Sequence, residues 1–151
     1  MIKPRSLPRP RKVNKVPFVE LYAGRLQGVV SSKSDIRRVY VSYFEAGNGN
    51  FYCSTNNNRV CGGLRGRPCK HLQELLDEAL LQFGAERIIN YMGLDLDPAK
   101  VSRGHDLLPG FKGGAHKVEA GMVFSRFLTY LSYVSLPPTA APIPEMAWFV
   151  R

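Results

Sequence analysis

Apolar residues recur at helical spacing over residues 72–83, which is the strongest pattern in the chain. Polar residues separate the apolar positions, which are Leu72, Leu75, Leu76, Ala79, Leu80 and Phe83. Spacing of three and four residues places these side chains on one face of an α-helix. Pro68 suits the first turn of a helix, and Gly84 is a typical stop. We therefore predict a helix that Pro68 opens and Gly84 ends, followed by a shorter helix over residues 85–93.

Residues 17–53 have the composition of β-strands. β-Branched and aromatic residues dominate the runs 17–30, 35–46 and 50–53, and turn-forming residues separate these runs. The segment 47–50, Gly-Asn-Gly-Asn, predicts a turn between two strands. We expect an antiparallel sheet of three or four strands with Cys53 at the end of the last strand. The predicted fold class is α+β, a small antiparallel β-sheet followed by helices.

The C-terminal third changes character twice. Turn residues predict a loop over residues 94–117, and residues 118–134 are apolar nearly all round. A helix of that kind is buried, either under the sheet of its own domain or in a partner. Residues 135–151 are proline-rich and predict an extended tail. We expect three apolar residues of this tail to anchor it in a groove of a partner protein, namely Met146, Trp148 and Phe149.

Charge narrows the classes of partner. The chain of 151 residues has a formal net charge of +9, which favours nucleic acid or an acidic protein surface. Residues 1–16 form a basic, proline-rich arm, which precedes a domain over residues 17–93. The arm supplies candidate phosphate contacts at Arg9, Arg11 and Lys12, or is only a solvated leader. No apolar leader or run of 18 apolar residues occurs, so we expect a cytoplasmic protein without a membrane partner.

All three cysteines fall within residues 51–72, together with one histidine. Cys53, Cys61, Cys69 and His71 offer three sulfurs and one imidazole, a complete tetrahedral set for one Zn²⁺ ion. In a reducing compartment, clustered cysteines are more often metal ligands than disulfides. Such a set leaves no position for a reactive water, so the predicted zinc is structural and joins the sheet to the helix. The alternative is three unrelated thiols and a surface histidine.

Basic residues lie between the predicted ligands. They are Arg59, Arg65, Arg67 and Lys70. One hypothesis makes them phosphate contacts, and another makes them counter-charges for an anionic thiolate site. The segment 65–68, Arg-Gly-Arg-Pro, also matches the core of an AT-hook, whose arginines enter a narrow minor groove.

The site resembles a known family. A β-hairpin with a Cys-x-Cys pair, a variable spacer and a Cys-x-His pair that opens a helix form the pattern of the SWIM-type zinc finger. Residues 67–76 are similar to its second half, and the resemblance spans about residues 27–83. Thr55 stands where the second cysteine of that pattern would be, and Cys61 follows six residues later. The resemblance implies a zinc-supported module that binds DNA or proteins and has no catalytic activity of its own.

Two functional hypotheses follow. The first is a non-catalytic module that binds nucleic acid through the basic residues around the zinc site and the N-terminal arm. Unpaired bases could then stack on aromatic residues of the strands, namely Tyr40, Phe44, Phe51 and Tyr52, although core packing is the alternative use of these side chains. The second is an adaptor subunit that docks in a protein complex through residues 118–134 and the tail. No paired acid and base indicates an enzyme, and no small-molecule substrate is evident.

Overall fold

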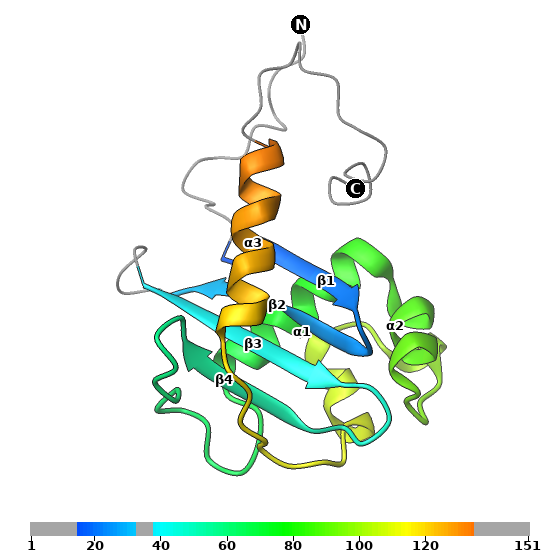
Figure 1. Ribbon diagram of the computed structural model, residues 1–151. Helices are drawn as coiled ribbons and strands as arrows, with labels where there is room; N and C mark the ends of the chain where they lie inside the picture. The colour runs from blue at the N-terminus through cyan, green and yellow to red at the C-terminus, as the bar shows by residue number, and fades with distance from the viewer. Residues whose placement is uncertain (1–14, 33–37, 135–151) are drawn as a thin grey trace, which may run out of the picture.

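The computed structural model describes residues 15–32 and 38–134 of the chain (Figure 1). The elements, in chain order, are β1 (Phe18–Tyr22), β2 (Arg25–Ser31), β3 (Val39–Glu45), β4 (Phe51–Thr55), α1 (Lys70–Phe83), α2 (Ala85–Met92), η3 (Pro98–Lys100), η4 (Gly104–Gly110) and α3 (Gly121–Val134). The strands form one antiparallel sheet in the order β1-β2-β3-β4, and the helices follow it in the chain. This arrangement confirms the predicted α+β fold.

Tight turns connect β1 to β2 and β3 to β4. Ala23 and Gly24 join β1 to β2 with φ values of 53° and 76°, and two successive positive φ values are typical of the type I′ hairpin turn. Gly47, with φ of 85°, lies in the predicted turn between β3 and β4. The register of that hairpin places Ser42 opposite Cys53. Cys53 therefore lies in the middle of β4 and not at its end.

The sheet separates two hydrophobic layers. Figure 1 shows α1 behind the sheet and α3 in front of it. The larger layer includes side chains of α1, α2 and η4, and the residues that the sheet contributes to it include Leu26, Val30, Phe44, Phe51 and Cys53. The smaller layer packs α3 on the opposite face through Phe18, Val29, Val41, Val123 and Phe127. The buried cysteine of β4 thus faces the layer that contains α1.

Helix α1 forms where the apolar periodicity predicts it. It begins two residues after Pro68 and ends at Gly84, whose φ of 84° suits glycine. Pro68 therefore precedes the helix instead of opening it. Gly28 in β2 lets the helix approach the sheet closely, because a Cβ atom there would lie 2.7 Å from Cδ1 of Leu75. The buried side chains of α1 are Leu72, Leu75, Leu76 and Ala79.

The segment predicted as a loop, residues 94–117, contains the two short 3₁₀ helices η3 and η4. Asp77 in α1 holds η4 in place, since its Oδ1 accepts a hydrogen bond of 2.7 Å from the backbone N–H of Gly104. A Cβ atom on Gly104 would lie 2.8 Å from the backbone nitrogen of Asp77. The absence of a side chain at position 104 therefore allows this contact.

Residues 111–120 carry the chain from one layer to the other. Phe51 in β4 donates a backbone hydrogen bond to Gly114 and accepts one from His116, at 3.0 and 2.9 Å. The side-chain oxygen of Asn58 then accepts a hydrogen bond of 2.7 Å from the backbone N–H of Ala120. The two bonds of Phe51 cover part of the outer edge of β4, where unpaired backbone groups would otherwise remain.

Helix α3 differs from its prediction in two respects. It begins at Gly121, and within this chain only Val123 and Phe127 are buried along it. Met122 and Leu128 are 61% and 49% exposed, because the sheet covers one side of the helix only. The expectation of burial on all sides is therefore not met by the described part of this chain.

A charged pair supports the docking of α3. Arg126 donates to both carboxylate oxygens of Glu20 in β1, at 2.6 and 2.9 Å. Gln27 in β2 donates to the same carboxylate at 2.7 Å. The guanidinium also lies 3.3 Å from the ring centroid of Tyr22. Two parallel charge-assisted bonds fix orientation as well as distance, so this pair sets how α3 lies on the sheet.

Candidate metal centre

The predicted ligands converge on one point between the sheet and α1. Cys53 lies on β4, Cys61 in the following loop, Cys69 at the N-cap of α1 and His71 in its first turn. One ligand atom from each residue lies within 4.8 Å of all the others. The three cysteines are free and buried. This group could hold a metal ion, as the residue types predicted.

A short backbone ladder brings Cys61 beside Cys53. The chain turns back after β4, where Asn58 adopts a φ of 66°, and residues 54 and 60 form an antiparallel bridge. The backbone N–H of Cys61 then donates to the carbonyl of Cys53 at 3.0 Å. Seven residues separate Cys53 from Cys61, yet the bridge brings the two cysteines together as the single intervening residue does in a Cys-x-Cys pair. Cys61, the remaining thiol, thus lies beside Cys53, where it could serve as a second ligand.

The distances fit a tetrahedral site. Bond lengths of about 2.3 Å to sulfur and about 2.0 Å to nitrogen give a sulfur–nitrogen edge of about 3.5 Å in a zinc tetrahedron. Nδ1 of His71 lies 3.8 Å from Sγ of Cys53 and 3.4 Å from Sγ of Cys61. Nδ1 is thus the ring nitrogen that faces the thiols. The donor set fits a metal with a preference for sulfur and imidazole.

Polar hydrogens of the protein are directed at two of the sulfurs. The buried hydroxyl of Ser42 donates to Sγ of Cys53 at 3.4 Å. The backbone N–H of Gly63 donates to Sγ of Cys61, also at 3.4 Å. Such donors stabilise thiolate charge and hold the sulfurs in place, as partners behind metal ligands do.

The thiols influence one another before any metal binds. The bond with Cys53 lowers the pKa of Cys61 to about 6, and burial opposes this shift. The same partner lowers the pKa of Cys69 to about 4, to which the backbone amide of Leu72 in the first turn of α1 contributes. Cys53 is the proton donor in both contacts, so its own pKa is raised above the ordinary range. The site therefore favours thiolates at Cys61 and Cys69.

The imidazole has a fixed orientation. Burial lowers the pKa of His71, but contacts with the sulfurs of Cys69 and Cys61 outweigh burial and leave the pKa raised. Its ring stacks on that of Tyr40 in β3, with centroids 3.9 Å apart. Sequence reasoning did not assign Tyr40 and Ser42 to the site. A register centred on the turn before β4 would have indicated Ser42, because that register pairs it with Cys53.

The basic residues between the ligands point to solvent. All four are exposed, namely Arg59, Arg65, Arg67 and Lys70. Arg65 donates to the carbonyl of Gly62 at 3.2 Å, and within the described ranges none of the four forms an ion pair with a carboxylate. No acidic residue occurs between positions 46 and 73. Residues 65–67 bend between Cys61 and Cys69, so this segment differs from the extended form expected of an AT-hook.

The remaining predicted contacts concern the aromatic residues expected to stack on bases and the residues of the chain ends expected to contact partners. Of the strand aromatics considered for base stacking, Phe44, Phe51 and Tyr52 are buried. They pack in the interior, which corrects the stacking hypothesis for these three. Tyr40 is half-buried against His71. The residues expected to contact nucleic acid or a partner from the chain ends lie outside the described residues; they are Arg9, Arg11, Lys12, Met146, Trp148 and Phe149.

Comparison of the chain with models of protein families, with characterised proteins and with solved structures finds no match. The similarity to SWIM-type fingers therefore stays a prediction from the residues quoted above. In the part of the chain that the structure describes, no helix combines the length and apolar character needed to cross a bilayer.

Proposed function

We propose that this protein is a non-catalytic, SWIM-like zinc module that binds nucleic acid through the basic residues around its metal centre. The observation that carries the proposal is the combination of two features in one segment. Four ligand atoms lie within 4.8 Å of one another, and four exposed cations lie between or beside these ligands without an intervening acid. We place the protein in a reducing compartment, the cytoplasm, because its cysteines are free.

Zinc is the metal that the ligands favour. Three thiolates and one imidazole complete a tetrahedron, which suits Zn²⁺ and leaves no open coordination position. The bound ion would contribute folding free energy and connect β4 to α1. Cys53, Cys61, Cys69 and His71 would hold it, and the hydroxyl of Ser42 and the N–H of Gly63 would support the sulfurs.

Phosphate binding follows from the charge of this surface. Three thiolates and Zn²⁺ leave one negative charge at the centre, and this charge offsets only part of the positive charge of the four exposed cations. Arg65 and Arg67 project from a segment that the ligands Cys61 and Cys69 hold at both ends. A zinc-ordered loop would therefore present two guanidinium groups to a nucleic-acid backbone at a low cost in loop entropy.

The test is fluorescence anisotropy of zinc-loaded protein with duplex DNA, single-stranded DNA and RNA over a salt series. The proposal expects affinity that falls with salt concentration, and a smaller salt slope in Arg65→Ala/Arg67→Ala because each lost phosphate contact reduces the slope by about one. Lys100→Ala/Lys112→Ala removes the same charge from exposed positions in the segment 94–117 and is the matched control. Equal slopes for both double variants would reject the arginine segment as a phosphate contact.

An adaptor role is the second candidate, and the exposed apolar side chains of α3 favour it. Met122 and Leu128 are 61% and 49% exposed, and Val134 at the end of the helix is 45% exposed. A partner protein would remove this surface from water. In this case, deletion of residues 137–151 leaves a folded protein that no longer copurifies with its complex. Loss of folding in that truncation would assign the tail to the protein's own stability.

A further inference from the structure

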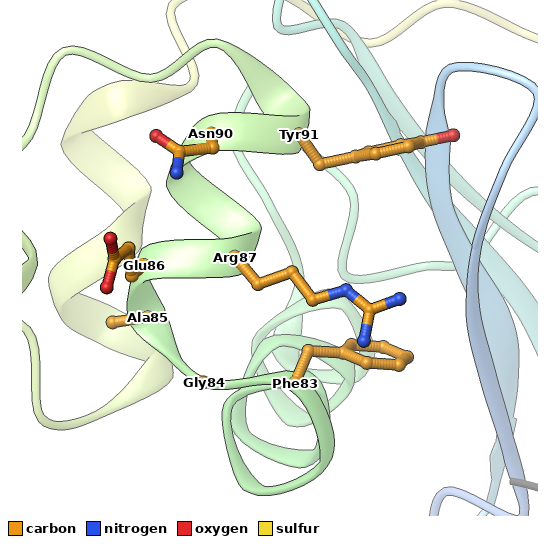
Figure 2. A pocket seen from close by; sticks show the side chains of 7 residues that line it. All are labelled: Phe83, Gly84, Ala85, Glu86, Arg87, Asn90 and Tyr91. Carbon is orange, nitrogen blue, oxygen red and sulfur yellow. The ribbon is translucent and has the colours of Figure 1, made fainter.

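A hollow of about 770 Å³ lies at the junction of α1 and α2 (Figure 2). Its lining residues are Phe83, Gly84, Ala85, Glu86, Arg87, Asn90 and Tyr91. The metal centre lies at the first turn of α1, and Phe83 is the last residue of the same helix. A rise of about 1.5 Å per residue places the two ends of this helix about 20 Å apart. The hollow is thus a surface separate from the metal centre.

Three side chains that can stack on a flat ring lie on one side of this hollow. Figure 2 shows Phe83, Arg87 and Tyr91 directed to the same side of α2, and Glu86 and Asn90 to the other. The guanidinium of Arg87 lies 5.2 Å from the ring centroid of Phe83. Arg87 and Tyr91 are four residues apart and therefore lie one above the other on the helix surface. The carboxylate of Glu86 does not face the stacking groups.

These groups are available to a ligand. Arg87 and Tyr91 are both exposed, and in the described part of the chain Arg87 forms no ion pair. The hydroxyl of Tyr91 accepts a hydrogen bond of 3.0 Å from the backbone N–H of Gly24 in the β1–β2 turn. That bond holds the ring in one orientation, so little side-chain entropy remains to be lost when a ligand binds.

We propose that this hollow binds an unpaired nucleobase, which enters between the ring of Tyr91 and the guanidinium of Arg87. Four residues of an α-helix rise by about 6 Å. A ring with contacts of about 3.5 Å on each face needs about 7 Å, a difference that the long side chain of Arg87 can supply. Every base has a π-face that stacks on tyrosine or arginine, and the guanidinium N–H groups remain free for the adjacent phosphate.

The proposal extends the function inferred for the metal centre without depending on it. Phosphates can bind either duplex or single strand, whereas a base that stacks on Tyr91 must be unpaired. Single-stranded nucleic acid long enough to reach both ends of α1 would contact both surfaces. The two proposals fail separately, because Arg65 and Arg67 govern one of them and Arg87 and Tyr91 govern the other.

The test uses full-length, zinc-loaded protein and a labelled short oligothymidine, with a duplex of matched length beside it. Tyr91→Leu removes the aromatic face and should weaken single-strand binding by about 5- to 100-fold while duplex binding stays unchanged. Tyr91→Phe retains the ring but loses the bond to Gly24, so it should weaken binding much less than Tyr91→Leu does. Arg87→Lys should give an intermediate loss because a planar group is replaced by a point charge. Equal affinity of Tyr91→Leu and the parent protein for the oligonucleotide overturns the proposal, and so does the absence of binding for both the oligonucleotide and a free nucleotide.

Photocrosslinking checks the position independently of any effect on folding. With an iodouracil-containing oligonucleotide and the parent protein, the crosslinked peptide should contain Tyr91 or Phe83, and crosslinks confined to other peptides count against the site. Titration with uridine monophosphate separates the two sources of a base. Saturable binding that Tyr91→Leu abolishes identifies a free nucleotide as a ligand of the hollow. Binding of the oligonucleotide alone, with the same dependence on Tyr91, identifies a strand.

Discussion

The ring of His71 lies on the ring of Tyr40, with centroids 3.9 Å apart and planes inclined by 16°. This stacking links β3 to the first turn of α1 and leaves Nδ1 of the imidazole directed at the sulfurs of Cys53 and Cys61. A metal ligand whose ring is already oriented loses less freedom on binding. Tyr40 therefore acts behind the ligand set, where partners commonly alter metal affinity by about 10- to 100-fold.

Replacement of Tyr40 tests this role. Tyr40→Leu should lower zinc affinity by about tenfold or more, because the imidazole can then rotate away from the thiols. Tyr40→Phe keeps the stacked ring and should bind zinc like the parent protein. Competition with a chromophoric chelator measures both affinities. If Tyr40→Leu and Tyr40→Phe bind equally well, the stacking does not orient the ligand.

Loss of a ligand should have a larger effect. Cys69→Ser or His71→Ala should lose the metal and lower the free energy of unfolding by several kcal/mol, because a structural metal adds its binding energy to folding. Metal analysis and thermal melts with and without chelator report the two effects. Arg67→Ala, two residues before Cys69, is the control and should melt like the parent. A folded, zinc-loaded Cys69→Ser protein would refute a structural role for this thiol.

Local signals made part of this architecture predictable. The apolar periodicity and Gly84 define α1, and the glycine-rich turn before β4 defines a hairpin, because these features act within a few residues. The ligand residues followed from their chemistry. The position of Cys61 beside Cys53 could not be predicted from the sequence, since it depends on the positive φ of Asn58 and on a backbone hydrogen bond to Cys53.

Burial was harder to predict than secondary structure. Residues 118–134 are apolar on most sides, but composition does not say how much of a helix a sheet can cover, and Leu128 is about half exposed. The rings of Phe44 and Phe51 are buried although they were considered for base stacking. Nothing in the sequence distinguishes a buried aromatic residue of a strand from one that stacks on a base. Their burial follows from the packing of α1 and Phe111 on that face of the sheet.

Replacement of Ser42 tests whether its hydrogen bond to Sγ of Cys53 contributes to metal binding. The neighbouring cysteines raise the pKa of Cys53, and this is the larger effect. The hydroxyl of Ser42 donates to Sγ of Cys53 and lowers the pKa of that thiol by a smaller amount. Ser42→Ala should therefore weaken zinc binding by about tenfold and leave the fold intact, because alanine fits the buried position. Ser54→Ala is a matched control, since Ser54 is equally buried but donates to the carbonyl of Thr55. Equal zinc affinity for the two variants would remove Ser42 from the site.

Zinc binding should release protons, and its affinity should fall as the pH is lowered. The raised pKa of Cys53 means that this thiol still carries its proton at neutral pH and must lose it to the metal. Against the opposing effect of burial, the thiols of Cys69 and Cys61 raise the pKa of His71 above its ordinary value of 6.5, so protons compete with the metal for this ring before they compete for Cys61, whose pKa is about 6. Calorimetry in buffers of different ionisation enthalpy measures the proton release. Proton release that does not increase below pH 7 would contradict the competition at His71.

The two layers of the sheet should respond separately to mutation. Arg126 and Glu20 join α3 to β1 on the face opposite the metal centre, and the bonds with Glu20 raise the pKa of Arg126 further, so the guanidinium stays charged. Removal of Arg126 leaves a partly buried carboxylate without its bidentate partner, which costs about 1–3 kcal/mol. Arg126→Met keeps most of the apolar length of the side chain, so its effect isolates the charge. A decrease in melting temperature of about 2–10 °C is expected.

A double-mutant cycle with Glu20→Gln then measures the coupling between the two groups. The double variant should recover part of the loss, because no unpaired charge remains. Zinc affinity should not change in any of the three variants, since the buried residues around Arg126 belong to the smaller hydrophobic layer and the ligands to the larger one. Loss of zinc in Arg126→Met would mean that α3 and the metal centre are coupled through the sheet. In that case, a partner bound to the exposed side of α3 would affect the metal centre.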